Sequence, residues 1–440
     1  MSTSSFDLSG DVLEQLLRPL TTQEFLDNYF GIQPLYIPGH PEKFTGLFSR
    51  RRFLHAVNNI PASPQHTPAL RGAIGRGATF PIHKDQVQHI LRAGGTICVS
   101  SIHHHDQRLA TMVNQIRARL NFAGTMGLHC YYSSQQCGFT THFDARIATT
   151  LQIAGRKRWR YGATPALPYP RQNGTLGNAH VRHLRRSSLD LAAWERVSPP
   201  DDSTFEEVLV SPGDVLCLPA GTWHEAQALD DESLALNLFF DQLDLSSVLS
   251  VLIDEELAGD PGWRKGVAPS LDQSREESTP PQMVLSELAA QLDTLAGVLS
   301  RIKDDPAKLT HAWNRVIALQ AWDNDSPAER PPAPSESITT EDRFVATKPA
   351  RLRYTTRQTA HGHAVLDVYF GAFHLELPIE CRPLLVQIKQ GATFRVRDIL
   401  ETDATPELAL TTLQTALQDL VCAGVLSRWT SQGADDFWAG

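Results

Sequence analysis

The residue types that could carry out metal chemistry gather in a stretch running from Gly138 to Gly155. His142 and Asp144 are two residues apart there, and residues at this spacing in a β-strand project to the same side. An imidazole and a carboxylate on one face can bind a single metal ion. The pair is a weak signal on its own, because two hydrogen-bonded surface residues would show the same spacing. A metal site therefore needs a third ligand from a neighbouring strand.

His224 is the candidate for this third ligand. It follows a tight turn at Pro212-Gly-Asp214, an apolar strand and a second turn at Pro219-Ala-Gly221. Two imidazoles and one carboxylate leave three coordination positions open, the arrangement typical of non-haem Fe(II) oxygenases. The 2-oxo acid 2-oxoglutarate can take two of these positions as a co-substrate, and dioxygen the last. The sequence thus predicts an Fe(II) site formed by His142, Asp144 and His224.

A cation that could hold the far carboxylate of 2-oxoglutarate follows the turn at Gly155. In the run Arg156-Lys-Arg-Trp-Arg-Tyr161, strand alternation places Lys157, Trp159 and Tyr161 on one face and the three arginines on the other. A buried lysine is costly unless it is paired, and the C5 carboxylate of the co-substrate would be its partner. A lone lysine is more often a solvated surface residue, so this prediction depends on the aromatic residues that share its face.

The composition fits a globular enzyme with more than one domain. The chain has 440 residues, of which 41% are hydrophobic and 20% charged, whereas a single domain seldom exceeds about 250 residues. The net charge of −9 argues against a surface built to bind nucleic acid. The N-terminus lacks a secretory signal, and no apolar run is long enough to span a bilayer. With no CxxC pair among the six cysteines, we expect a cytoplasmic protein with reduced thiols and no membrane partner.

The pattern of elements changes along the chain. Near the N-terminus, Thr21-Thr-Gln-Glu24 predicts a capped helix and Pro34-Leu-Tyr-Ile-Pro38 a strand. From residue 127 to 241, short β-rich segments with closely spaced turn signals predict an antiparallel sandwich or barrel. The following pattern is helical, and apolar residues recur at spacings of three and four from Leu285 to Ile302. That stripe indicates either an intramolecular bundle or the seam of a homodimer.

The last part of the chain has a composition of its own. Residues 323–337 are rich in proline, serine and charge, which predicts an extended linker. Beyond it, two strand-like runs flank Gly371-Ala372 as a hairpin. Helical segments are expected near 383–389, 396–400 and 406–420. We expect a small α+β module of winged-helix type over residues 345–440.

Three segments together resemble the JmjC domain of the ribosomal oxygenases: Tyr131 to Asp144, Leu151 to Tyr161, and Pro212 to His224. That family consists of cupin-fold 2-oxoglutarate oxygenases that hydroxylate side chains of ribosomal proteins. The resemblance implies a mainly β catalytic core, a double-stranded β-helix of the cupin or jelly-roll type. It also implies a helical dimerisation region and a C-terminal winged-helix-like module. The resulting division is a catalytic domain (1–245), a helical region (246–322), a linker (323–344) and a winged-helix-like domain (345–440).

The resemblance also implies roles for individual residues. Matched position by position, it makes His142, Asp144 and His224 the iron ligands. Lys157 becomes the residue that binds the C5 carboxylate. Ser133 matches a hydroxyl residue that also contacts 2-oxoglutarate, and Asn237 matches an asparagine beside the iron. These six residues form the site that the sequence predicts.

The predicted function is hydroxylation of a side chain in a protein or peptide, with Fe(II), 2-oxoglutarate and dioxygen. A ribosomal protein is the target that the resemblance implies. The same chemistry on the precursor of a ribosomally made natural product stays open as an alternative. A demethylase is less expected, because nothing in the sequence resembles a methyl-ammonium cage. A DNA-binding regulator with a cupin sensor is disfavoured by the acidic net charge and the intact ligand set.

Two further features are interpreted as structural. His103-His-His-Asp106 resembles a metal site, but contiguous histidines alternate across a strand and cannot all reach one ion. We therefore expect a solvated loop there. Trp159, Phe239 and Phe240 are expected in the core rather than in a platform for substrate.

Overall fold

The protein divides into two compact units, the first ending at Gln242 and the second beginning at Leu243. The computed structural model describes residues 6–61, 69–177, 180–183, 197, 200–266, 282–319, 337–347, 351–359, 361–391, 393–401 and 408–428. Within these residues, no helix combines the length and the apolar character needed to cross a membrane.

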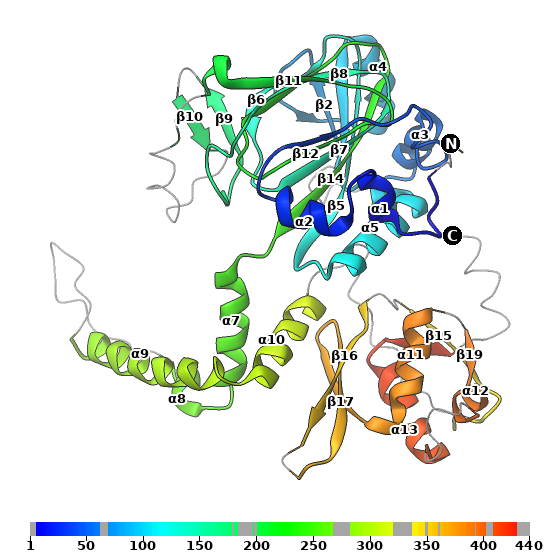
Figure 1. Cartoon of the computed structure of the whole chain (residues 1–440), viewed down its shortest axis with the longest axis vertical. Coiled ribbons are helices and arrows are strands. Elements are labelled where there is room, and N and C mark those ends of the chain that lie inside the picture. Colours follow the sequence, from blue (N-terminus) through cyan, green and yellow to red (C-terminus); the bar gives the residue numbers. More distant parts are fainter. Residues whose placement is uncertain are drawn as a thin grey trace. The chain divides into compact units, whose positions relative to one another are not determined.

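The first unit is built on two antiparallel sheets, as the closely spaced turn signals predicted (Figure 1). The larger sheet has the order β1 (Leu35–Ile37), β12 (Val215–Leu218), β7 (Ile147–Ala154), β14 (Ser233–Gln242), β5 (Gly124–Ser133), β4 (Gly95–Val99), β2 (Leu70–Ile74), β3 (Phe80–Pro81). The smaller sheet has the order β10 (His180–His183), β9 (Gly174–Gly177), β6 (Gly138–Phe143), β13 (His224–Ala228), β8 (Lys157–Gly162), β11 (Phe205–Val210).

In two runs of this unit, successive strands alternate between the two sheets. From β5 to β8, and again from β11 to β14, each strand lies in the other sheet from the strand before it. This alternation is the winding of a double-stranded β-helix, the jelly-roll architecture that the resemblance implied. It brings strands that are far apart in the sequence, such as β6 and β13, into direct pairing.

The outer face of the larger sheet carries the main core. Leu128, Leu236 and Leu238 are fully buried there in one apolar cluster with residues of the N-terminal helices. These helices are α1 (Val12–Leu17), α2 (Thr22–Asn28), α3 (Arg50–Asn58), α4 (Val87–Arg92) and α5 (Gln107–Leu120). Short 3-10 helices lie at η1 (Lys84–Gln86), η2 (Ile102–His105) and η4 (Asp202–Thr204). The capping box predicted at Thr21 and Glu24 is confirmed, with the Thr21 side chain accepting from the Glu24 N–H and the Glu24 side chain accepting from the Thr21 N–H.

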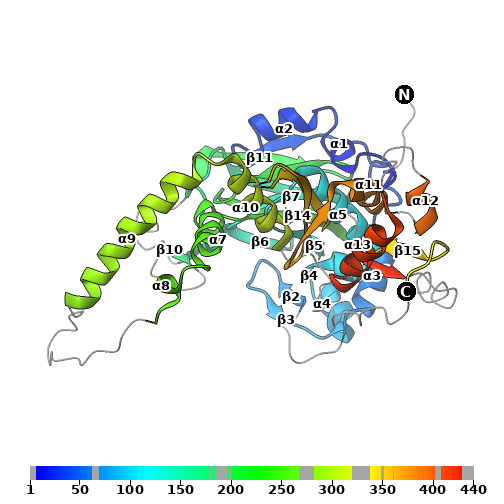
Figure 2. The same ribbon diagram turned by 90° about the horizontal axis from the view of Figure 1, so that it is seen from below.

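The second unit begins with helices α7 (Leu245–Leu257), α8 (Pro261–Arg264), α9 (Gln282–Ile302) and α10 (Pro306–Leu319). Figure 2 shows α9 as a long straight helix that approaches α10 at its C-terminal end. There Ile302 packs with Leu252 and Ala312 in a small apolar cluster. Towards the other end of α9, Leu288 and Leu292 remain 52% and 64% exposed. The predicted apolar stripe is thus intramolecular core at one end and open surface at the other.

The rest of the second unit is the small α+β module that the sequence predicted. One sheet consists of β15 (Arg343–Ala346), β19 (Phe394–Arg395) and β20 (Leu426–Arg428), and the other of β16 (Arg353–Gln358), β17 (Ala364–Phe370) and β18 (Phe373–Pro378). The helices are η6 (Ile379–Cys381), α11 (Arg382–Gln390), α12 (Val396–Leu400) and α13 (Leu410–Cys422). The hairpin predicted at Gly371-Ala372 is confirmed, and β15 already begins within the stretch assigned to the linker. Residues 323–336 of that linker lie outside the described part of the chain.

Candidate metal centre

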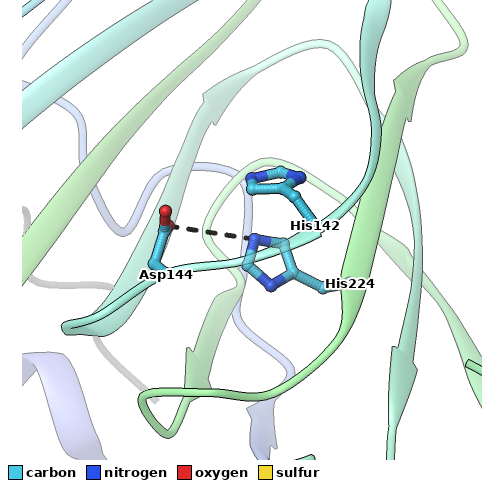
Figure 3. A group of neighbouring side chains, drawn as sticks. All are labelled: His142, Asp144 and His224. Atoms are coloured by element: carbon cyan, nitrogen blue, oxygen red, sulfur yellow. Dashed lines mark ion pairs between the residues drawn. The ribbon is translucent and has the colours of Figure 1, made fainter. Parts of the chain in front are cut away.

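His142 and His224 lie opposite each other in the paired strands β6 and β13 of the smaller sheet. Their ring centroids are 4.3 Å apart, and both rings point to the same place (Figure 3). The register between the two strands shifts immediately after this pair, between His224 and Ala226. Such irregularities are common next to active sites, where they change the direction of a side chain.

Backbone carbonyls fix the orientation of both rings. His142 Nδ1 lies 2.7 Å from the carbonyl oxygen of Thr140, and His224 Nδ1 lies 2.9 Å from that of Thr222. A carbonyl oxygen can only accept, so each Nδ1 carries the proton and each Nε2 keeps a free lone pair. Burial lowers the pKa of His224 to about 4, with a further lowering by His142 that Asp144 opposes. The ring is therefore neutral at ordinary pH, as a metal ligand must be.

Asp144 completes the group from the turn after β6. Its Oδ2 atom lies 4.0 Å from His224 Nε2, shown by the dashed line in Figure 3. Its Oδ1 atom accepts a hydrogen bond of 2.8 Å from the side-chain amide of Asn173, whose own oxygen accepts from the N–H of Ala145 at 2.7 Å. Asn173 therefore holds one oxygen and leaves the other free to bind a metal. Sequence reasoning missed Asn173, because it stands in an irregular segment with no motif.

The three side chains fit a divalent metal ion. Their ligand atoms all lie within 4.8 Å of one another, and no other such group of His, Cys, Asp or Glu occurs in the described ranges. Bonds of about 2.0–2.1 Å place two ligand atoms of one ion up to about 4 Å apart, so small side-chain movements suffice. Orientation of the two imidazoles by carbonyls and of the carboxylate by an amide is the support that metal ligands usually receive.

A pocket between the two sheets joins this group to Lys157. Its lining includes Tyr131, Lys157 and Trp159 together with His142, Asp144 and His224. As the alternation predicted, Lys157, Trp159 and Tyr161 are buried while the arginines between them face outward. No carboxylate of the described chain lies within ion-pair distance of the Lys157 ammonium, and its nearest aromatic partner is Tyr131, whose ring centroid is 5.8 Å away. Burial lowers the pKa of Lys157 to about 8, partly opposed by Cys130 and Cys98.

The two remaining predicted residues are placed differently from each other. Asn237 is buried in the pocket lining, and its Oδ1 atom has no hydrogen-bond partner in the described part of the chain. Ser133 is buried outside the pocket lining, where its hydroxyl accepts a hydrogen bond of 3.0 Å from Thr96. The structure thus brings Asn237 to the site and holds Ser133 against the neighbouring strand β4. Contacts of either residue with 2-oxoglutarate stay predictions.

The histidine run at His103 is not the solvated loop that was expected. His103 is buried in η2, and its Nδ1 atom accepts a hydrogen bond of 3.1 Å from the N–H of Leu128. The turn at the start of α5 therefore carries a structural histidine. Sequence reasoning missed this role, because the partner is a backbone group in β5.

The fold and this three-ligand group define a cupin-type double-stranded β-helix protein with a candidate site for a mononuclear metal. Residues 102–246 match the JmjC domain family, so the chain carries a JmjC domain, as its motifs predicted.

Comparison with known proteins finds several relatives of this chain. The chain is 27% identical to the uncharacterized protein YxbC of Bacillus subtilis, over 67% of this chain and 88% of that one. It is 23% identical to ribosomal oxygenase 2 of Rattus norvegicus, over 52% of this chain and 46% of that one. It is also 23% identical to the bifunctional lysine-specific demethylase and histidyl-hydroxylase NO66 of Drosophila persimilis, over 53% of this chain and 32% of that one. The match therefore spans less than half the length of the two named oxygenases.

A solved structure shares the fold over nearly the whole chain. YcfD, a ribosomal oxygenase from Escherichia coli solved in complex with cobalt and 2-oxoglutarate, superposes with a TM-score of 0.55 at 17% identity. The superposition covers 94% of this chain and 99% of YcfD. At this level of identity the likeness shows the fold alone.

Proposed function

We propose that this protein is an Fe(II)- and 2-oxoglutarate-dependent oxygenase that hydroxylates a side chain of a polypeptide. The observation that carries the proposal is one pocket that holds two imidazoles, one carboxylate and a buried lysine without a carboxylate partner in the described chain. Iron bound there supplies the redox chemistry, in which decarboxylation of 2-oxoglutarate activates dioxygen. YcfD, which has this fold, was solved with cobalt and 2-oxoglutarate.

The residues of the chain have separate tasks in this proposal. His142, Asp144 and His224 bind the metal and leave three positions open for co-substrate and dioxygen. Lys157 pairs with the C5 carboxylate, which satisfies a charge that is otherwise buried without a counter-ion. Trp159 is part of the pocket wall and keeps water from the reacting atoms. Asn237 offers its unpaired Oδ1 atom as an acceptor to a water beside the metal.

The names of two relatives support the proposed class of substrate. Ribosomal oxygenase 2 and the histidyl-hydroxylase NO66 are named for reactions on proteins, which supports a protein substrate, with a ribosomal protein as the first candidate. They support a protein target over a natural-product precursor peptide. The name of NO66 also includes lysine-specific demethylase activity, so demethylation is the second candidate.

A mass measurement on captured substrate tests the proposal. The Asp144→Ala variant serves as an inactive trap, and its cellular interactors are incubated with wild type, Fe(II) and 2-oxoglutarate. A gain of one oxygen, with one succinate formed for each modified residue, is the expected result. Loss of a methyl group would mean demethylation, and formation of no succinate with any interactor would refute the oxygenase assignment.

The second unit has proposed roles of its own. Leu285, Leu288 and Leu292 are exposed on α9 and form an apolar surface that a second copy of the chain would bury. We therefore propose that the protein is a homodimer. The hairpin of β17 and β18 with helices α11 to α13 is consistent with a winged-helix-like module. Because the whole chain has a net charge of −9, we assign this module to substrate docking or dimerisation rather than to nucleic-acid binding, in a cytoplasmic protein.

A further inference from the structure

A second cluster of side chains lies on the inner face of the larger sheet, one residue pair beyond Asn237. Asn237 pairs with His129 of β5, and Phe239 follows on the same face of β14 by alternation. The rings of His129 and Phe239 stack with centroids 4.5 Å apart and an angle of 27°. The guanidinium carbon of Arg146 lies 4.6 Å from the centroid of Phe239. Phe239 is therefore a platform for two polar groups, and not only the core residue that the sequence predicted.

Gly127 leaves the space in which the Phe239 ring lies. Gly127 faces Phe239 across the strand pair, and a Cβ atom there would lie 3.0 Å from the ring and 2.4 Å from His103. Only glycine leaves room for both rings. Stacking of this kind and a cation over the ring fix the positions of the imidazole and the guanidinium relative to each other.

Hydrogen bonding determines the tautomer of His129. Its Nδ1 atom accepts a hydrogen bond of 3.2 Å from the backbone N–H of Ser101. An imidazole that accepts at Nδ1 is neutral and carries its proton on Nε2. Burial, reinforced by the Arg146 charge and opposed by Asp144, lowers the pKa of His129 to about 3, in agreement with a neutral ring. His129 therefore presents an Nε2–H donor.

This tautomer excludes a hydrogen bond between His129 and Arg146. The Nη1 atom of Arg146 lies 3.5 Å from Nε2 of His129, and both atoms are donors, so they do not bond to each other. The other contact of Arg146, to Oδ2 of Asp241, is also 3.5 Å, longer than the usual 2.7–3.2 Å of an N–H···O bond. The Arg146 side chain is 33% exposed. Apart from this 3.5 Å ion pair of Arg146 with Asp241, the two donors have no acceptor in the described part of the chain.

The position of these donors relative to the metal group indicates what they bind. Arg146 follows Asp144 by two residues, and Asp144 acts electrostatically on His129. Tyr131 and His129 lie on the same face of β5. Lys157 is near Tyr131, whereas His129 is the next residue on this face towards the exposed Arg146. The co-substrate would extend from the metal towards Lys157. The paired donors therefore lie on the side from which a substrate side chain would enter.

We propose that His129 Nε2 and the Arg146 guanidinium form a paired donor site for a carboxylate of the polypeptide substrate, an inference that rests on the proposed oxygenase function. Two N–H groups side by side match the two oxygens of a carboxylate, and the arginine makes the interaction charge-assisted. An uncharged carboxamide has one oxygen for these donors and binds more weakly. The residue presented to the metal, or its neighbour, is thus aspartate or glutamate rather than arginine or lysine.

Binding of peptide pools to the full-length protein tests this preference. Mn(II) replaces Fe(II), so that 2-oxoglutarate binds without turnover, and four pools of capped heptapeptides have Asp, Asn, Leu or Arg at the centre between randomised residues. Retention of the Asp pool should exceed that of the Leu and Arg pools by about 10- to 100-fold, the effect of one charge-assisted hydrogen bond. Equal retention of the four pools at any level, or preference for Arg, would overturn the proposal.

Variants separate the contributions of the two donors. Arg146→Met should bring the Asp pool to the level of the Leu pool, and Arg158→Met, which removes an exposed arginine bonded to Gln227, should change nothing. His129→Gln keeps an amide donor near the position of Nε2 and should retain part of the preference that His129→Phe loses. An unchanged Asp preference in Arg146→Met would refute the paired site.

The affinity for 2-oxoglutarate distinguishes the two possible sources of the carboxylate. It should be the same in wild type and Arg146→Met, because Lys157 and not Arg146 binds the co-substrate. Loss of 2-oxoglutarate binding in Arg146→Met would assign the donors to the co-substrate and overturn the substrate site. Absence of 2-oxoglutarate binding in wild type would instead refute the proposed oxygenase function. A nitrogen NMR spectrum that shows a protonated Nδ1 on His129 would also contradict the inference, whatever the pools show.

Discussion

Asp144 and Asn173 are joined by a hydrogen bond of 2.8 Å from the side-chain amide to Oδ1 of the carboxylate. The same asparagine is anchored by the N–H of Ala145, so the carboxylate cannot turn without breaking a bond. One oxygen is thereby held and the other is free to bind the metal. Asn173 is a positioning residue for the metal site.

Asn173→Ala should weaken metal binding by about 10- to 100-fold, because loss of such an outer contact lets the ligand turn away. The measurement is a titration of the purified protein with Fe(II) without oxygen. Asn28→Ala, which removes an amide bonded to the carbonyl of Glu24 on α2, is the matched control and should leave the affinity unchanged. An unaltered affinity in Asn173→Ala would mean that the carboxylate needs no support.

Asp144→Ala should abolish the metal site, because it removes the only anionic ligand. Anaerobic Fe(II) and 2-oxoglutarate are expected to give wild type a weak visible charge-transfer band, since the co-substrate needs two adjacent open positions. The band should be absent in Asp144→Ala and in His224→Ala. Full turnover by either variant would refute the three-ligand assignment.

Local periodicity explains which parts of the site could be predicted from the sequence. Strand alternation placed His142 with Asp144, and Lys157 with Trp159, because the members of each pair are two residues apart, within one strand or directly after it. Asn173 could not be found in this way, since it reaches Asp144 from an irregular segment 29 residues further on. Contacts of this kind depend on the path of a loop, which no periodic pattern encodes.

Pairing between distant strands was equally hidden. The cluster of His129 and Phe239 exists because β5 pairs with β14, about a hundred residues apart, in one particular register. A shift of one residue would turn either side chain to the other face of the sheet. The stripe on α9 illustrates the reverse case, because its period predicted an apolar face correctly but did not tell which part packs within the chain.

A double substitution, Leu288→Glu with Leu292→Glu, should convert the proposed dimer into monomers. Both side chains are more than half exposed on α9, and burying a leucine contributes about 1.5–3 kcal/mol, which a charged residue would forfeit. Light scattering of dilute protein should show the mass falling by half. Leu209→Glu, at an exposed leucine of β11, is the control and should stay dimeric. A monomeric wild type would refute the dimer.

Lys157→Ala should weaken 2-oxoglutarate binding by about 10- to 150-fold, because it removes a charge-assisted hydrogen bond worth about 1.5–3 kcal/mol. Lys157→Arg should keep part of the affinity, whereas Lys157→Met, similar in size but uncharged, should not. Calorimetric titrations with metal first and 2-oxoglutarate second measure both steps, and the metal step should change little. Unchanged 2-oxoglutarate affinity in Lys157→Met would mean that another cation holds the co-substrate.

The pH dependence of 2-oxoglutarate binding should report the protonation of Lys157. Its pKa in the free protein is about 8, lowered mainly by burial, so the ammonium is largely charged at pH 7 and neutral well above pH 8. Only the charged form pairs with the carboxylate, so affinity should be constant below pH 8 and fall by up to about tenfold per unit above it. In Lys157→Arg the fall should disappear, because a guanidinium stays charged up to about pH 12. Titrations of the Mn(II)-loaded protein between pH 6 and pH 10 measure this, and a flat wild-type profile would show that the lysine charge does not contribute to co-substrate binding.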